Sequence, residues 1–185
     1  MENMYQKITS SLTNVPLKVR AGHFATNHAH LNYHIYLTTM KARASEAKDL
    51  AEALVRNYLF GIVVDTIICN EGTEVIGAFL AEALGEAGAL NTNAHKTIYV
   101  VTPEFNMNSQ IIFRDNTKMM IAGKHVLILD GTITTGKALN RVVEAIQYYG
   151  GTLTGIAEVF SAISELYGTP VMSVYGKPDL PDYAF

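Results

Sequence analysis

Residues 130–136, Asp-Gly-Thr-Ile-Thr-Thr-Gly, place one carboxylate, three hydroxyls and two glycines directly after a run of apolar residues. Glycine allows backbone angles that other residues resist, so successive N–H groups can converge on one concave point. The hydroxyls of Thr132, Thr134 and Thr135 can donate to phosphate oxygens. A helix that begins after Gly136 would add its free N–H groups and its dipole. This spacing predicts an anion site that would bind a phosphate group.

The acid of this segment predicts a second role, because a carboxylate cannot itself bind phosphate. Asp130 is placed to accept hydrogen bonds from sugar hydroxyls or to hold a hydrated Mg²⁺. The segment lacks the Gly-x-x-x-x-Gly-Lys-Ser/Thr pattern of a Walker loop, and it does not match the dinucleotide-binding fingerprint. An ordinary strand-to-helix turn with a threonine cap is the alternative that these residues leave open.

The elements around this segment alternate along the chain between two periodicities. Amphipathic stripes at helical spacing alternate with short, nearly continuous apolar runs that suit strands buried on both faces. The pattern predicts helices at 42–59, 73–86 and 137–149, and strands at 62–69, 97–102, 125–129, 153–160 and 171–175. We therefore expect an α/β fold with a doubly wound parallel sheet in a single domain, residues 1–185. In such sheets ligands bind beyond the carboxyl ends of the strands.

The first forty residues do not follow this alternation. They contain an irregular stretch rich in histidine and tyrosine, which is expected to form a hood or flap over the ligand end of the core, residues 41–185. A packed N-terminal extension explains the stretch equally well. A metal cluster at His28, His30 and His34 is disfavoured, because no carboxylate lies near them in sequence.

Composition excludes several classes of protein. Of the 185 residues 49% are hydrophobic and 17% charged, which argues for a packed core and against disorder, and the net charge of −3 does not suit a general nucleic-acid binder. One cysteine, Cys69, cannot form a disulfide within the chain or a cysteine-based zinc site, and it is expected to be a buried structural thiol. Without an apolar leader or an apolar run of spanning length, the protein is expected to be cytoplasmic, with no membrane partner.

The segment VLILDGTITTG, residues 126–136, resembles the signature of type I phosphoribosyltransferases. The order of the remaining segments is similar to that of the orotate phosphoribosyltransferase branch. GHFATNHAHLNYHIYLT, residues 22–38, stands where that branch carries its base-covering segment, and VDTIICNEGTEVIGAFLAEAL, residues 64–84, stands where it carries a strand, a pyrophosphate loop and a helix.

The resemblance implies an enzyme that transfers ribose 5-phosphate from 5-phosphoribosyl 1-diphosphate to a nucleobase, orotate-like or purine, with Mg²⁺ and as a homodimer. In this reading the lid is the segment 104–118, which looks polar and irregular and would close over the diphosphate. The resemblance implies that the 5′-phosphate is bound by Thr132, Ile133, Thr134, Thr135 and Gly136. It implies that Asp130, beside Gly131, contacts the ribose hydroxyls, and that pyrophosphate is bound by Asn70, Glu71 and Gly72. The lid cations Arg114 and Lys118 would stabilise the leaving group.

Three features depart from the family pattern. Gly131 replaces the second acid of the signature, the lid is not rich in lysine, and Ser161-Ala162 stands where the orotate branch offers an arginine to the orotate carboxylate. The replacement of the acid favours an alternative function, a non-catalytic homologue that senses the diphosphate or a nucleotide. An unrelated α/β phosphate-binding protein is a third possibility, and it would share the family spacing by chance.

Overall fold

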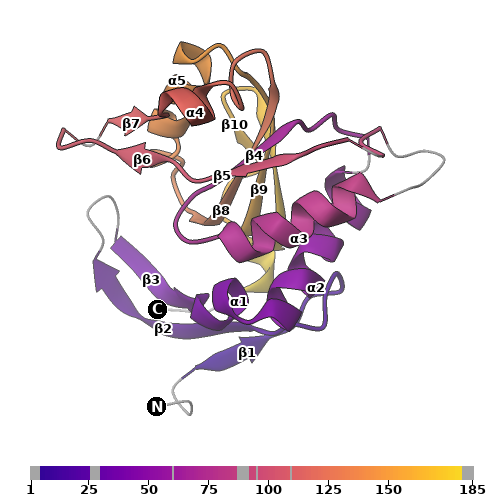
Figure 1. Cartoon of the computed structure of the whole chain (residues 1–185). Helices are drawn as coiled ribbons and strands as arrows, with labels where there is room; N and C mark the ends of the chain where they lie inside the picture. Colours follow the sequence, from indigo (N-terminus) through magenta and orange to yellow (C-terminus); the bar gives the residue numbers. More distant parts are fainter. Residues whose placement is uncertain are drawn as a thin grey trace.

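A computed structural model describes residues 5–25, 30–59, 61–86, 92–94, 96–108 and 110–180 of the chain. Its main sheet has six strands in the order β10-β11-β9-β8-β4-β5 (Figure 1). The five strands from β11 to β5 are parallel, and only the edge strand β10 is antiparallel to its neighbour. The strands of this sheet are β4 (Thr66–Cys69), β5 (Tyr99–Val101), β8 (His125–Ile133), β9 (Thr152–Ser161), β10 (Glu165–Leu166) and β11 (Thr169–Gly176). The predicted α/β class with a parallel sheet is confirmed.

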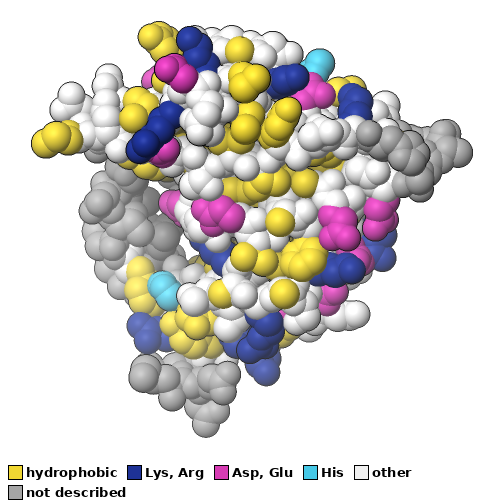
Figure 2. Space-filling model, viewed as in Figure 1, with side chains coloured by type: hydrophobic (Ala, Val, Ile, Leu, Met, Phe, Trp, Pro, Cys, Tyr) yellow, Lys and Arg dark blue, Asp and Glu magenta, His cyan; other side chains and the backbone are white. Residues whose placement is uncertain are grey.

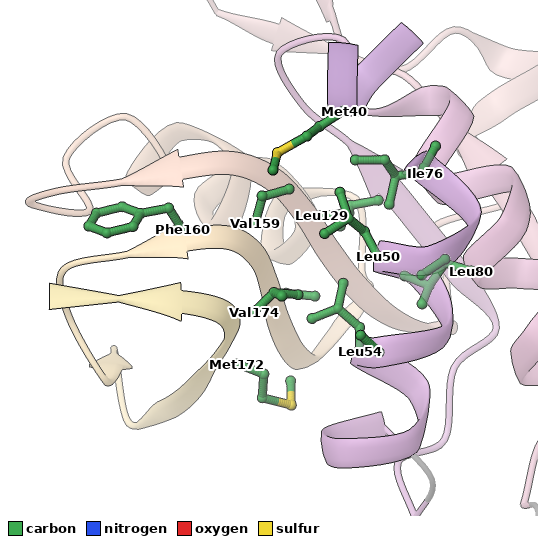
Figure 3. Close-up of a cluster of buried hydrophobic side chains, with 14 of the residues drawn as sticks. Met40, Leu50, Leu54, Ile76, Leu80, Leu129, Val159, Phe160, Met172 and Val174 are labelled. Carbon is green, nitrogen blue, oxygen red and sulfur yellow. The ribbon is translucent and has the colours of Figure 1, made fainter. Parts of the chain in front are cut away.

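Helices cover both faces of the sheet. One face packs against α1 (Thr38–Ala42), α2 (Ala44–Leu54) and α3 (Glu74–Gly85), and the labelled side chains of Figure 3, such as Leu50, Leu80 and Leu129, belong to this core. The other face packs against α5 (Asn140–Tyr148), whose Val142 and Ile146 are buried with residues of β8. A short π-helix, η2 (Val55–Leu59), follows α2, and a 3₁₀ turn, η3 (Lys177–Asp179), follows β11.

The buried strands and helices follow from their side chains. The core of β4 and β8 is made of β-branched and leucine residues, which pack well on a sheet covered on both faces. Helix α3 lies so close to β4 that a Cβ added at Gly77 would be 2.2 Å from the sulfur of Cys69. Glycine at this position therefore permits the close packing. Cys69 is fully buried, and burial raises the pKa of its thiol to about 12. The expectation of a buried structural thiol is therefore confirmed.

The N-terminal segment forms its own antiparallel sheet, β1 (Gln6–Ile8), β2 (Leu17–Ala25) and β3 (His30–Tyr36). Its base is part of the main core, because Leu17 and Val19 are buried beside α2 and β11. The far end of β2 and β3 projects from the sheet on the same side as the hairpin β6–β7 (Figure 1). The role of a hood stays a prediction, and His28 and the side chain of His30 lie outside what the structure describes. The ring of His34 packs against Tyr5 and Phe24.

Two predicted boundaries beside the site are wrong, and so is the predicted irregularity of the segment 104–118. Strand β8 continues four residues beyond Leu129, because its ladder with β9 extends to Ile133. Helix α5 begins at Asn140 rather than directly after Gly136, and a turn fills residues 137–139. The segment 104–118 is not irregular. It contains the hairpin β6 (Glu104–Phe105) and β7 (Ile111–Ile112), and then the single turn α4 (Asp115–Lys118).

Within the described residues, none of the helices has the length and apolar character to cross a bilayer.

Candidate functional site

The candidate site lies at the carboxyl ends of the neighbouring strands β4 and β8. Strand β4 ends at Cys69 and runs into Asn70, while β8 carries Asp130 near its end. The side-chain amide of Asn70 donates to Oδ2 of Asp130 over 2.9 Å, and both residues are buried. The structure thus joins two segments that the sequence separates by sixty residues, and it does so at the edge where parallel sheets bind ligands.

The loop after β4 has an unusual backbone. Glu71 has φ +51°, in the left-handed region that a residue with a side chain rarely adopts, and Gly72 follows with φ +79°. Thr73 anchors the loop, because its buried hydroxyl lies 2.9 Å from the carbonyl of Asn70 and 3.0 Å from that of Leu129. Such outliers persist where the surroundings hold them, and they concentrate at ligand sites.

The carboxyl group of Asp130 is held in place from two sides. Besides the bond from Asn70, its Oδ1 accepts the backbone N–H of Gly131 over 2.6 Å. Burial raises the pKa of Asp130 to about 6, and the nearby charge of Glu71 adds to this rise. The two hydrogen bonds and the ammonium of Lys41 oppose it. Near neutral pH the group is therefore an oriented carboxylate, able to accept from sugar hydroxyls.

The predicted phosphate segment is divided between a strand and a turn. Thr132 and Ile133 belong to β8, and Ile133 is buried in the core below α5. The N–H groups of Thr134, Thr135 and Gly136 make no hydrogen bond to any residue that the structure describes. They are therefore available to an anion, whereas the dipole of α5 begins one turn later than expected.

Gly136 is enclosed by neighbouring side chains. It is buried, its φ is +75°, and an added Cβ would lie 2.6 Å from Cδ1 of Leu166. Gly131, in contrast, lies outside the left-handed region. An added Cβ there would lie 2.7 Å from Cε and 2.8 Å from Nζ of Lys41. Gly136 thus meets both a conformational and a spatial need, whereas Gly131 makes room for a lysine.

Two cations beside the phosphate segment were missed by the sequence reasoning. A cavity of about 280 Å³ lies between the loop after β4, the hairpin β6–β7 and the start of α5. Its walls include Lys137 and Arg141, with Asn70 and Glu71 opposite and Phe105 from the hairpin. The sequence did indicate these cations, because Lys137 directly follows the last glycine of the motif and Arg141 is four residues further along the predicted helix 137–149.

The two cations expected in the lid are not placed at the site. Arg114 forms an ion pair with Glu104, over 2.9 Å, within the segment itself. Lys118 ends α4, two residues before Met120, whose carbonyl accepts the hydroxyl of Thr66 at the first residue of β4. Lys118 therefore lies toward the amino end of β4, the edge opposite to Asn70. At the tip of the hairpin β6–β7, Figure 2 shows hydrophobic side chains on the surface, and Phe105 and Met107 are exposed there.

A second buried carboxyl group was also missed. Glu158 on β9 is the register partner of Asp130 on β8 and is fully buried. Neither oxygen of its carboxyl group has a hydrogen-bond partner among the described residues. Burial raises the pKa of Glu158 well above its ordinary value, and the charges of Asp130 and Glu71 add to the rise. No three histidine, cysteine or acidic residues among those described form a cluster that could hold a metal ion.

Comparisons with known proteins point to one group of enzymes. No family model matches the chain. It is 38% identical over 66 residues to an orotate phosphoribosyltransferase of Mycobacterium avium, an alignment that spans 32% of this chain and 37% of the relative, so about a third of that relative's length.

Two solved structures share the fold over most of the chain. One is the orotate phosphoribosyltransferase of Mycobacterium tuberculosis in complex with 5-phospho-α-D-ribosyl 1-diphosphate, with a TM-score of 0.55 and 19% identity over 80% of this chain and 82% of that one. The other is an adenine phosphoribosyltransferase of Thermoanaerobacter pseudethanolicus, with a TM-score of 0.58 and 16% identity over 95% and 96%. At these identities the likeness establishes the fold. Together with the sequence match it confirms the resemblance to the orotate branch.

Proposed function

We propose that this chain is a phosphoribosyltransferase, which transfers ribose 5-phosphate from 5-phosphoribosyl 1-diphosphate to a nucleobase and releases pyrophosphate. The observation that carries the proposal is the hydrogen bond between Asn70 and Asp130. It brings a loop with left-handed Glu71 and Gly72 against the motif segment that ends at Gly136. The two halves of a donor site, one for diphosphate and one for ribose 5-phosphate, are therefore adjacent.

Each part of the donor has a matching group. The N–H groups of Thr134, Thr135 and Gly136, which have no partner among the described residues, would take the 5′-phosphate. Lys137 follows them directly in the chain, and with Arg141 it lines the cavity next to the loop after β4. Asp130 would accept from the ribose hydroxyls. The diphosphate would lie along the loop 70–72, whose backbone curves in the manner that anion sites use.

The reaction would be a displacement at C1′ of the ribose. The bond from C1′ to the diphosphate oxygen breaks, the diphosphate keeps the electron pair, and a ring nitrogen of the base bonds to C1′ and gives its proton to solvent. The carboxylate of Asp130 would hold the ribose hydroxyls and support the positive charge that develops on the sugar. No covalent intermediate on the protein is required.

The donor set fits Mg²⁺ bound chiefly through the ligand. Mg²⁺ usually keeps several waters and takes one or two carboxylates with substrate phosphates, and Asp130 and the exposed Glu71 flank the proposed diphosphate position. When bound, the ion would neutralise the negative charge of the diphosphate.

The test is a pyrophosphate-release assay with the diphosphate donor and Mg²⁺ across orotate, uracil and the purine bases. Release with one base, abolished in Asp130→Asn and retained in the exposed Glu144→Gln of α5, would support the proposal. If the protein binds neither the donor nor any nucleoside monophosphate in calorimetry, the proposal is wrong.

A sensor without turnover is the second candidate, because Gly131 removes the second acid at the ribose. Donor binding in calorimetry, without pyrophosphate release in the presence of any base of the panel, would identify it.

A homodimer is also proposed. The exposed Phe105 and Met107 at the hairpin tip support it, since exposed apolar clusters mark contact surfaces. Light scattering of wild type and Met107→Ser tests the assembly.

A further inference from the structure

Lys41 on α1 lies between the two halves of the proposed donor site. Its ammonium donates to the carbonyl oxygen of Glu71 over 2.5 Å, which fixes it to the loop after β4. The same nitrogen lies over Gly131, since an added Cβ there would be 2.8 Å away. A lysine ammonium has three donors, and the Glu71 carbonyl uses one of them. The remaining donors lie between the ribose end and the diphosphate end of the site.

The elements around Lys41 hold it there. Helix α1 connects the N-terminal sheet to α2, and its Met40 is buried in the main core, as Figure 3 shows. Leu37, at the start of the helix, is also buried and would lie 3.1 Å from a Cβ on Gly131. The small residue and the lysine are therefore matched, because any side chain at position 131 would meet the ammonium.

The charges of the site require a cation at this point. Asp130, Glu158 and Glu71 surround the region, and Lys41 is the positive group that acts on both buried carboxyls. A diphosphate entering here would be repelled by the charges of Asp130 and Glu71, whereas the buried Glu158 favours its neutral form. Arg114 is paired with Glu104, so it does not offset this repulsion in the structure as described.

We propose that Lys41 binds the 1-diphosphate of the donor, across the loop 70–72 and in the space that Gly131 leaves open. This inference rests on the proposed function and adds a specificity-determining residue to it. Compared with the family signature, the chain would lack the second carboxylate at the ribose and would have the ammonium of Lys41 at the diphosphate instead. A ligand that lacks the diphosphate gains nothing from Lys41.

The test compares two ligands by calorimetry, each with Mg²⁺ and with a chelator, in wild type, two lysine-to-methionine variants and a Lys41→Arg rescue variant. The ligands are 5-phosphoribosyl 1-diphosphate and ribose 5-phosphate. The methionine variants are Lys41→Met and the control Lys48→Met, which removes an exposed lysine from α2. Lys41→Met should weaken the diphosphate donor about ten- to a hundred-fold and leave ribose 5-phosphate within about two-fold, by the strength of a charge-assisted hydrogen bond. Lys48→Met should change neither, and Lys41→Arg should recover part of the loss.

Equal weakening of both ligands, or no change in either, would overturn the inference, because Lys41 would then act only as a counter-ion for buried acids. Melting temperatures identify a variant that fails to fold, and in that event Lys41→Arg and Gly131→Ala carry the comparison. Failure of the proposed function would look different, since wild type would then bind neither ligand.

Discussion

Asp130 and Glu158 are register partners on the parallel strands β8 and β9, so two buried carboxyl groups lie side by side at the carboxyl end of the sheet. Two groups donate hydrogen bonds to the oxygens of Asp130, whereas no group in the described part of the chain donates to Glu158. The pair is therefore unequal. Asp130 can ionise near pH 6, while Glu158 favours its neutral form over a wider range. A buried acid without partners is costly when it is charged.

Stability should fall with rising pH because of Glu158. Its pKa in the folded protein is well above the ordinary value of 4.5, so the folded state binds the proton more tightly than the unfolded chain does. The contribution of the neutral acid is complete below 4.5 and is lost as pH rises toward the folded pKa. Glu158→Gln should therefore be about 1–3 kcal/mol more stable than wild type at pH 8, with little difference at pH 4. Denaturant unfolding at both pH values measures this.

The matched control for that experiment is Glu144→Gln on the exposed side of α5. It removes the same charge without removing a buried one, so its stability should follow wild type at both pH values. A Glu158→Gln protein that is less stable than wild type at pH 8 would contradict the assignment of Glu158 as an uncompensated buried acid.

Ligand binding should depend on the ionisation of Asp130. Its pKa of about 6 makes it a carboxylate at pH 7.5 and a neutral acid at pH 5, and the ionised form accepts more strongly from ribose hydroxyls. Asp130→Asn should bind a nucleoside monophosphate about ten- to a hundred-fold more weakly than wild type at pH 7.5. At pH 5 the two affinities should converge. The variant also corrects for titration of the ligand phosphate, whose second pKa is about 6. A constant ratio across this range would exclude Asp130 as the titrating group.

Gly131 should be coupled to Lys41 rather than to a backbone angle. Gly131→Ala introduces no strain in φ, but its Cβ displaces the ammonium of Lys41. We expect a fold of near wild-type stability and an affinity for the diphosphate donor close to that of Lys41→Met. In the double variant Gly131→Ala, Lys41→Met, the second change should add less than about two-fold. Fully additive losses in calorimetry would show that the two positions act independently.

Gly136→Ala should lower both stability and phosphate binding. The residue has φ +75°, where a side chain costs about 1–2 kcal/mol, and its Cβ would also approach Leu166. Gly123→Ala is the control. It has a similar φ of +69°, but no atom lies within 4 Å of an added Cβ. Thermal unfolding should show the larger loss for Gly136→Ala, and nucleoside monophosphate binding should weaken only in that variant. If the two variants weakened binding equally, Gly136 would not belong to the phosphate site.

The local sequence pattern predicted the fold class and the segment that carries the candidate site. The alternation of helical stripes with apolar runs predicted the parallel sheet, because a strand buried on both faces needs continuous apolar residues. Burial of Cys69 followed from its place at the end of such a run. The acid and glycines of residues 130–136 indicated an anion site, since their chemistry depends on neighbours in sequence. Even there the boundaries moved, because pairing with β9 extends β8 through Ile133.

The charges of the site were decided by tertiary structure alone. Lys41 reaches the carbonyl of Glu71, thirty residues away, and lies over Gly131. Glu158 meets Asp130 through strand register, while Arg114 pairs with Glu104 within its own segment. No periodicity encodes these contacts, because they depend on how separate strands align and on where a helix end comes to rest. Sequence supplied the groups that could bind a phosphorylated sugar, and packing determined which charges surround it.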